Sequence, residues 1–193
     1  ALPICNAFFP SELVDIFGYT SQNIMPGESV LKRCFMLFIE IDSFWDILSR
    51  IGHEDSFQLV NSYMKWLFPL IKEYGGTVVS SSGDKFLVMF ERSAKDAAEA
   101  ALMIQTQLYV YNGQRSRYDY EPIHMTTALH YGDIAIGVVG FDGKIEFTIF
   151  SDMIYLFEIL KMMAAKLGKK SVASGEFVLA AKESGVSDFV FAE

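Results

Sequence analysis

The run from residue 77 to residue 90, Thr-Val-Val-Ser-Ser-Ser-Gly-Asp-Lys-Phe-Leu-Val-Met-Phe, constrains the fold more than any other part of the chain. Two β-rich runs, residues 77–79 and 86–90, flank a short turn of serine, glycine and aspartate. This pattern predicts a β-hairpin with the Asp84 carboxylate at its tip. A bend rich in glycine and serine lets the backbone approach a ligand closely, which makes Asp84 a candidate metal ligand. The alternative is that Asp84 only shapes the tight turn, where aspartate is common.

The composition indicates one globular domain with a substantial core. The chain has 193 residues, of which 51% are hydrophobic and 21% charged. A formal net charge of −8 argues against binding nucleic acid through its phosphates, but not against a nucleotide held by a metal ion. Two cysteines are too few for a disulfide framework, which favours a reducing compartment. With no run of transmembrane length and no cationic signal peptide, we expect a cytoplasmic domain, or the cytoplasmic part of a protein with upstream sensor or membrane domains.

Residues 34–41, Cys-Phe-Met-Leu-Phe-Ile-Glu-Ile, form a nearly all-apolar run that predicts a strand buried on both faces. Glu40 interrupts this run near its end, and Asp42 follows at a spacing that can share its face. A lone carboxylate there is costly unless it is paired, hydrogen-bonded or bound to a metal. Glu40 is therefore either a metal ligand or a strand-end carboxylate satisfied by backbone donors.

The rest of the chain interleaves helices with strands, which predicts an α+β or mixed α/β class. The expected helices are residues 44–74, 93–111, 151–167 and 175–184. The further expected strands are residues 123–131, 134–139, 145–150, 171–173 and 188–192, the first two joined at Gly132-Asp133. Residues 1–32 are interpreted as a lead-in segment and residues 33–193 as the domain. His130 is expected to be structural and the Met162-Met163 pair to lie in the core.

Four motifs, in order, resemble the catalytic domain of the class III adenylyl and guanylyl cyclases. Residues 38–44, Phe-Ile-Glu-Ile-Asp-Ser-Phe, resemble the family's first metal motif, Phe-x-Asp-Ile-x-Gly-Phe. Residues 75–84 resemble its second metal motif, residues 129–140 its Gly-Ile-His-x-Gly segment, and residues 147–152 its Tyr-Thr-Val-Ile-Gly-Asp segment. The lead-in, with Phe9-Pro10, Leu13, Gly18 and Gly27-Glu28, is similar to the segment before many bacterial cyclase domains. The resemblance implies an α+β, ferredoxin-like βααββαβ palm-type fold, with a ligand cleft shared by two subunits.

The resemblance also implies a reaction and its metal ions. In this family the ribose 3′-hydroxyl of ATP or GTP attacks its own α-phosphorus, giving a cyclic nucleotide and pyrophosphate. Two Mg²⁺ or Mn²⁺ ions, held by two acidic side chains, support this step. The corresponding residues here are Glu40, where the family has Asp, and Asp84. Glutamate keeps the charge but moves the carboxylate outward by one methylene.

Substrate contacts follow from the same resemblance. Ser80 stands at the base-selecting position, which is Lys in adenylyl and Glu in guanylyl cyclases, and a serine cannot discriminate as either does. Thr148 stands at the second base-reading position and leans toward adenine. The backbone after the first motif is expected to hold the triphosphate. It comprises Ile41, Asp42, Ser43 and Phe44.

The transition-state positions depart most from the family. Tyr155 and Ile159 stand where the family places Asn and Arg, four residues apart on one helix face. Isoleucine cannot stabilise growing negative charge on phosphates as arginine does. The family's phosphate-binding Lys has no counterpart by motif. Four nearby lysines do not match it, namely Lys161, Lys166, Lys169 and Lys170.

Three interpretations remain open from these departures. The first is a degenerate cyclase domain that is inactive as a homodimer and acts as a regulatory or dimerising module in signalling. The second is the metal-supplying half of a heterodimer, whose partner provides Asn and Arg. The third is an active homodimer that uses substitute residues. The expected partners are a second copy or a homologous cyclase domain, with ATP or GTP and without nucleic acid.

Overall fold

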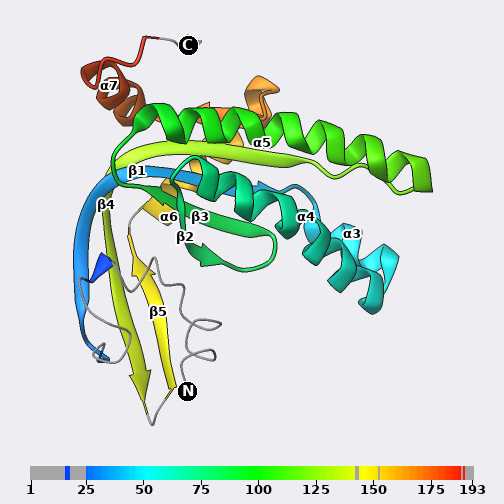
Figure 1. The fold of residues 1–193 in the computed structure, drawn as a ribbon, viewed down its shortest axis with the longest axis horizontal. Coiled ribbons are helices and arrows are strands. Elements are labelled where there is room, and N and C mark those ends of the chain that lie inside the picture. The colour runs from blue at the N-terminus through cyan, green and yellow to red at the C-terminus, as the bar shows by residue number, and fades with distance from the viewer. Residues whose placement is uncertain (1–15, 18–24, 142–143, 152, 188, 190–193) are drawn as a thin grey trace.

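The computed structural model describes residues 16–17, 25–141, 144–151, 153–187 and 189. Strands and helices interleave along the chain (Figure 1). The strands are β1 (Ser29–Ile41), β2 (Thr77–Ser81), β3 (Lys85–Phe90), β4 (Met125–Phe141), β5 (Lys144–Phe150) and β6 (Ser171–Ala173). The helices are α3 (Phe44–Ile51), α4 (His53–Glu73), α5 (Ala94–Arg115), the short 3₁₀ turn Ser116–Tyr118, α6 (Met153–Leu167) and α7 (Gly175–Glu183). None of the helices in the described ranges is long and apolar enough to cross a membrane.

The strands form one sheet in the order β2-β3-β1-β4-β5, with β6 added beside β4. All neighbours pair antiparallel except β4 and β6, which run parallel. In Figure 1 the long strands β1 and β4 curve strongly, and β4 and β5 extend away from α4 and α5. This arrangement confirms the expected α+β palm-type fold.

The two faces of the central strands belong to two hydrophobic clusters, as the twofold alternation of a strand requires. Leu37, Ile39 and Ile41 of β1 lie in the larger cluster with buried side chains from α4, α5 and α7. Cys34 and Met36 point to the other face and lie in a smaller cluster with α6. The apolar run of β1 is thus explained by burial on both sides, as expected from its composition.

The hairpin predicted from residues 77–90 is confirmed. Strands β2 and β3 pair antiparallel, with a register shift between Val78 and Ser80. Gly83 has a positive φ of 87°, which favours glycine at this point of the turn. The Tyr63 hydroxyl of α4 donates a hydrogen bond to the Gly83 carbonyl, so the turn is tied to the helix beneath it.

Two expectations about the middle of the chain were wrong. Residues 123–131 and 134–139 are not two strands joined at Gly132-Asp133, because β4 runs unbroken through that point and pairs with β1 from Met125 to Gly137. Gly132 opposes Cys34 in the ladder, and a Cβ there would lie 2.6 Å from His130 Nε2, so the glycine relieves crowding instead of forming a turn. The expected helix over residues 44–74 is two helices, because Gly52, at φ 82°, separates α3 from α4.

Smaller differences concern the ends of elements and one methionine pair. Strand β1 begins at Ser29, five residues before the run expected from composition, because its first residues pair with the far half of β4. Met162 and Met163 are exposed on α6 and not part of the core. The expected strand over residues 188–192 and the lead-in residues Phe9, Pro10, Leu13 and Gly18 lie outside the described residues.

Candidate functional site

The two predicted metal residues lie at one end of the sheet, Glu40 near the end of β1 and Asp84 in the turn immediately before β3. Glu40 of β1 is directly opposite Lys85 of β3. Asp84 precedes Lys85, and its carbonyl accepts a hydrogen bond of 2.9 Å from the Ile41 amide. The hairpin register therefore brings both residues to the end of β1. That the two carboxylates share a metal ion stays a prediction.

The Glu40 carboxylate is held by two lysines. Its side chain is only 14% exposed, and Lys161 of α6 donates to both of its oxygens, at 3.0 Å and 2.9 Å. Lys85 lies 3.7 Å away. Glu40 thus has ammonium groups as partners for both of its oxygens, which neither alternative from the sequence included, and its role as a metal ligand stays a prediction.

Glu158 closes this cluster from the same helix. Its carboxylate accepts from Lys85 at 3.0 Å and from Lys161 at 2.9 Å. The hydrogen bonds from Lys161 and Lys85 lower the pKa of Glu158 below its ordinary value. Burial alone would lower the pKa of Lys161, but its hydrogen bonds to Glu158 and Glu40 outweigh burial and raise it. These directions favour the charged forms of Glu158 and Lys161, and the hydrogen bond to Glu158 likewise raises the pKa of Lys85.

Asp84 has a different environment. The residue is 8% exposed, and the contact from Ser82 Oγ to its Oδ1 is long, at 3.4 Å. Tyr63 is its neighbour on the α4 side, since burial first and the charge of Asp84 second raise the pKa of the Tyr63 hydroxyl. Asp84 thus keeps carboxylate oxygens that no lysine of the described residues occupies.

These environments decide how well the site fits a divalent cation. Mg²⁺ requires close, well-placed oxygen ligands, and Asp84 can provide one. A metal ion at Glu40 would first have to displace Lys161, so Glu40 does not fit the role as it stands. Nor do three or more His, Cys, Asp or Glu side chains gather into a metal-binding group anywhere in the described residues.

In the predicted triphosphate-binding segment, residues 41–44, some backbone amides are already hydrogen-bonded within the fold. The Ile41 amide donates to Asp84, and the Asp42 amide donates to the His124 carbonyl at 2.9 Å. Ser43 has a left-handed backbone, with φ at 54°, and α3 begins at Phe44. Because the first amides of a helix have no partner within it, the turn at Ser43 and Phe44 is the part of this segment that can donate to an anion.

Asp42 adds a second lysine-paired carboxylate beside that turn. Its Oδ2 accepts from Lys170 at 3.1 Å, and its Oδ1 accepts from the Thr126 hydroxyl at 2.8 Å. Lys170 follows α6 and immediately precedes β6. Glu40 and Asp42, the two acidic residues at the end of β1, are thus each paired with a lysine from the C-terminal part of the chain.

The predicted transition-state positions lie on the outer side of α6. Tyr155 is 78% exposed and Ile159 44% exposed, so both face away from the smaller cluster that α6 covers. The Ser151 hydroxyl accepts from the Met153 amide at the start of this helix. No charged group stands at either position.

The predicted base contacts come from two strands that approach each other. Ser80 is exposed in β2, and Thr148 is half-buried in β5 opposite Gly137 of β4. Strands β2 and β5 come into contact although they are not paired. This placement is compatible with both residues facing one cleft.

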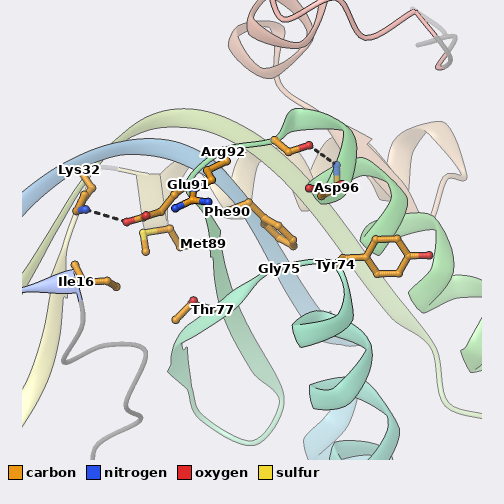
Figure 2. Close-up of a pocket in the computed structure, with 11 residues that line it drawn as sticks. Ile16, Lys32, Tyr74, Gly75, Thr77, Met89, Phe90, Glu91, Arg92 and Asp96 are labelled. Carbon is orange, nitrogen blue, oxygen red and sulfur yellow. Dashed lines mark hydrogen bonds and ion pairs between the residues drawn. The ribbon is translucent and has the colours of Figure 1, made fainter.

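A hollow of about 420 Å³ lies away from all these residues. Figure 2 shows it between the end of β3 and the start of α5, with the Lys32–Glu91 ion pair and Arg92 at its wall. Ser93 caps α5 there by accepting from the Asp96 amide. None of the site residues predicted from the sequence lines this hollow, so it does not mark the candidate cleft.

Sequence reasoning missed the three lysines that occupy the site. Lys161 and Lys170 were noticed only as lysines near an absent motif, and Lys85 not at all. The spacing of Lys161 from Glu40, 121 residues, is too long for any local pattern to reveal. The one local signal is the pair Glu158 and Lys161, three residues apart on one helix face.

The family follows from these features together with a direct match. Residues 28–167 match the model of the adenylate and guanylate cyclase catalytic domain. The chain belongs to this family. It is 25% identical, over 153 residues, to the adenylate cyclase of Anabaena cylindrica, covering 76% of this chain and 30% of that protein. The chain thus spans about a third or less of the curated cyclases it first matches.

Solved structures of cyclases share the fold. The adenylyl cyclase CyaB from P. aeruginosa superposes with a TM-score of 0.68 at 20% identity, over 81% of this chain and 83% of that one. A class III adenylyl cyclase-like ATP-binding protein from Pseudomonas aeruginosa also gives 0.68, at 14% identity, over 86% of this chain and 37% of that one. The resemblance drawn from the four motifs is confirmed for family and fold.

Proposed function

We propose that this cyclase-family domain binds a nucleoside triphosphate but does not cyclise it, and that it acts in signalling by pairing with a second copy or a homologous domain. The observation that carries the proposal is on α6. Tyr155 and Ile159 are exposed where the family's charge-stabilising Asn and Arg stand. Losing one such donor costs about 10²–10³ in rate, so losing both leaves turnover near background.

Nucleotide binding is supported by the parts of the cleft that remain. The turn at Ser43 and Phe44 offers helix-start amides, and Asp84 keeps an oxygen for a cation. Ser80 and Thr148 stand on strands that approach each other. The fold is shared with a protein described as an adenylyl cyclase-like ATP-binding protein.

Pairing is supported by the exposed side of α6. Tyr155, Ile159 and Met162 recur at a spacing of four and three residues and are all exposed, which gives the helix an apolar stripe. A guanylyl cyclase domain from Blastocladiella emersonii that shares the fold is described as dimeric. A second copy or a homologous domain is the occupant we propose for this stripe.

The test combines binding with turnover. We expect calorimetry to register binding of ATP or GTP in the presence of Mn²⁺, while the same preparation makes no cyclic nucleotide. Rapid production of cyclic AMP or cyclic GMP would overturn the proposal, and no heat of binding would leave only the pairing module. The variant Ser80→Lys should shift the ATP-to-GTP preference toward ATP, whereas Ser81→Lys, on the neighbouring exposed residue, should not.

The heterodimer is the second candidate, favoured by the intact Asp84. In that case, adding a homologous domain that carries Asn and Arg on its α6 equivalent would produce activity that neither domain has alone. The contact between Lys161 and Glu40 argues against this role, because a metal-supplying half needs both carboxylates. We therefore expect the mixture to stay inactive, and sustained turnover would decide for the heterodimer.

A further inference from the structure

We propose that Lys161 is a built-in cation that takes the place of a divalent metal ion at Glu40. The cleft end of the sheet would then be neutralised by the chain itself. This inference concerns the cleft of the proposed function but does not depend on whether the domain binds or cyclises nucleotides.

Geometry carries the inference. The Lys161 ammonium lies at nearly equal distances from both Glu40 oxygens, 3.0 Å and 2.9 Å, and so sits centrally in front of the carboxylate. The Glu40 side chain is only 14% exposed, which leaves little room for a second cation from solvent. A metal ion using Glu40 needs the same oxygens at shorter range.

Charge balance supports it independently. Glu40 and Glu158 carry two negative charges, and Lys85 and Lys161 carry two positive charges, all linked by contacts of 3.7 Å or less. A divalent ion entering this neutral cluster would meet two ammonium groups, which oppose its binding. Two carboxylates and two lysines from β1, β3 and α6 thus hold one another without an external cation.

The length of the Glu40 side chain explains how its carboxylate can meet Lys161 instead of a metal ion. Glutamate, where the family has aspartate, carries its carboxylate one methylene farther from the strand. Glu40 shares its sheet face with Met36, on the side covered by α6, from which Lys161 reaches it. The longer side chain at residue 40 and Lys161 thus meet on one face of the sheet.

Asp84 is not part of this cluster, which restricts the inference to one of the two predicted metal positions. Its neighbours are Ser82 and Tyr63, and no lysine contact to it occurs in the described part of the chain. A cation bound at Asp84 would be coordinated by neither of the Glu40 oxygens. The experiment can therefore separate the two carboxylates.

The experiment measures Mn²⁺ binding to the nucleotide-free protein by electron paramagnetic resonance. We expect Glu40→Gln to leave the affinity of the wild-type chain unchanged, because Glu40 is not a ligand. Lys161→Met should free Glu40 and tighten Mn²⁺ binding by at least about tenfold. The double variant Glu40→Gln/Lys161→Met should lose this gain. Lys166→Met, an exposed lysine on the same helix, is the matched control and should change nothing.

Two results would overturn the inference. One is that Glu40→Gln weakens Mn²⁺ binding by the otherwise wild-type chain about tenfold or more, which would make Glu40 a ligand despite Lys161. The other is that Lys161→Met folds normally and gains no affinity. If Lys161→Met fails to fold, the comparison of wild type with Glu40→Gln still decides whether Glu40 binds metal. Neither readout involves nucleotide, so failure here is distinct from failure of the proposed function.

Discussion

The two faces of β1 and β3 differ in what their side chains do. Toward α4, α5 and α7 the face is apolar from Phe35 to Ile41. Toward α6 the face begins apolar, at Cys34 and Met36, but ends in Glu40 with its lysines. The first face serves packing alone, whereas the second combines packing with the charges of the candidate cleft. The comparison teaches that one strand can pack apolar side chains on one face and hold a partly exposed ion-pair cluster at the end of the other.

His130 belongs to the same mixed face. It is opposite Met36 in the ladder and is buried, with its Nδ1 2.8 Å from the Ser174 hydroxyl and 3.8 Å from the Glu176 carboxylate. Burial lowers the pKa of His130, and the Glu176 charge opposes this only in part. The expectation that His130 is structural agrees with its burial and its contact with the cap of α7.

The largest loss of stability should come from creating a cavity in the apolar face that packs against α4, α5 and α7. Phe86→Ala removes a fully buried ring that contacts Tyr63 and Phe68, and should lower the free energy of unfolding by about 3–5 kcal/mol. Phe157→Ala, on α6, removes the ring stacked on Phe38 and should cost less, because a single helix covers that face and can settle into the space. Chemical denaturation of both variants checks the order, and an equal or reversed order would break the contrast between the faces.

A smaller effect should come from the charge cluster. Glu40→Ala leaves two ammonium groups, those of Lys85 and Lys161, on the single carboxylate of Glu158 and should lower the free energy of unfolding by about 1–2 kcal/mol, a modest loss because both lysines are partly exposed and screened. The loss should shrink in high salt. Denaturation at two salt concentrations measures this, with the exposed pair Lys95 and Glu99 as a control through Glu99→Ala. A loss independent of salt would indicate that Glu40 acts through packing.

His130 should contribute a pH dependence of stability. Because its folded pKa lies below the ordinary value of 6.5, the unfolded chain binds the proton more readily. The stability from neutral His130 is therefore complete above about pH 6.5 and is lost as the pH falls through the lowered folded value. The free energy of unfolding, measured at several values between pH 7.5 and 5, should depend less on pH in His130→Gln than in the wild-type chain. The exposed control His124→Gln should keep the wild-type pH dependence. An unchanged slope in His130→Gln would refute this assignment.

The smallest effect on stability should come from the outer side of α6. Tyr155→Ala and Ile159→Ala each remove an exposed side chain and should change the free energy of unfolding by no more than about 0.5 kcal/mol. The same variants should weaken self-association in light scattering, because the stripe is the proposed pairing surface. Unchanged self-association of both variants would refute the proposed pairing surface.

Much of the fold was predictable from local patterns. The serine and glycine turn before Asp84 predicted the hairpin, and the apolar run through residue 41 predicted a strand buried on both faces. The break at Gly52 and the continuity of β4 were not predictable in the same way. Gly132-Asp133 has the composition of a turn, but pairing with Cys34 and Arg33, including the 3.1 Å Arg33–Asp133 contact, keeps it extended.

The sequence by itself determined which chemical groups are present and absent at the candidate site. Residue types are readable one at a time, so the expectation that Tyr155 and Ile159 stand where the family has Asn and Arg needed no structure. Only the tertiary structure decided the state of Glu40, because the partner that holds its carboxylate is Lys161, on a helix 121 residues away. An ion pair depends on distance in space, and the docking of α6 on the sheet sets that distance.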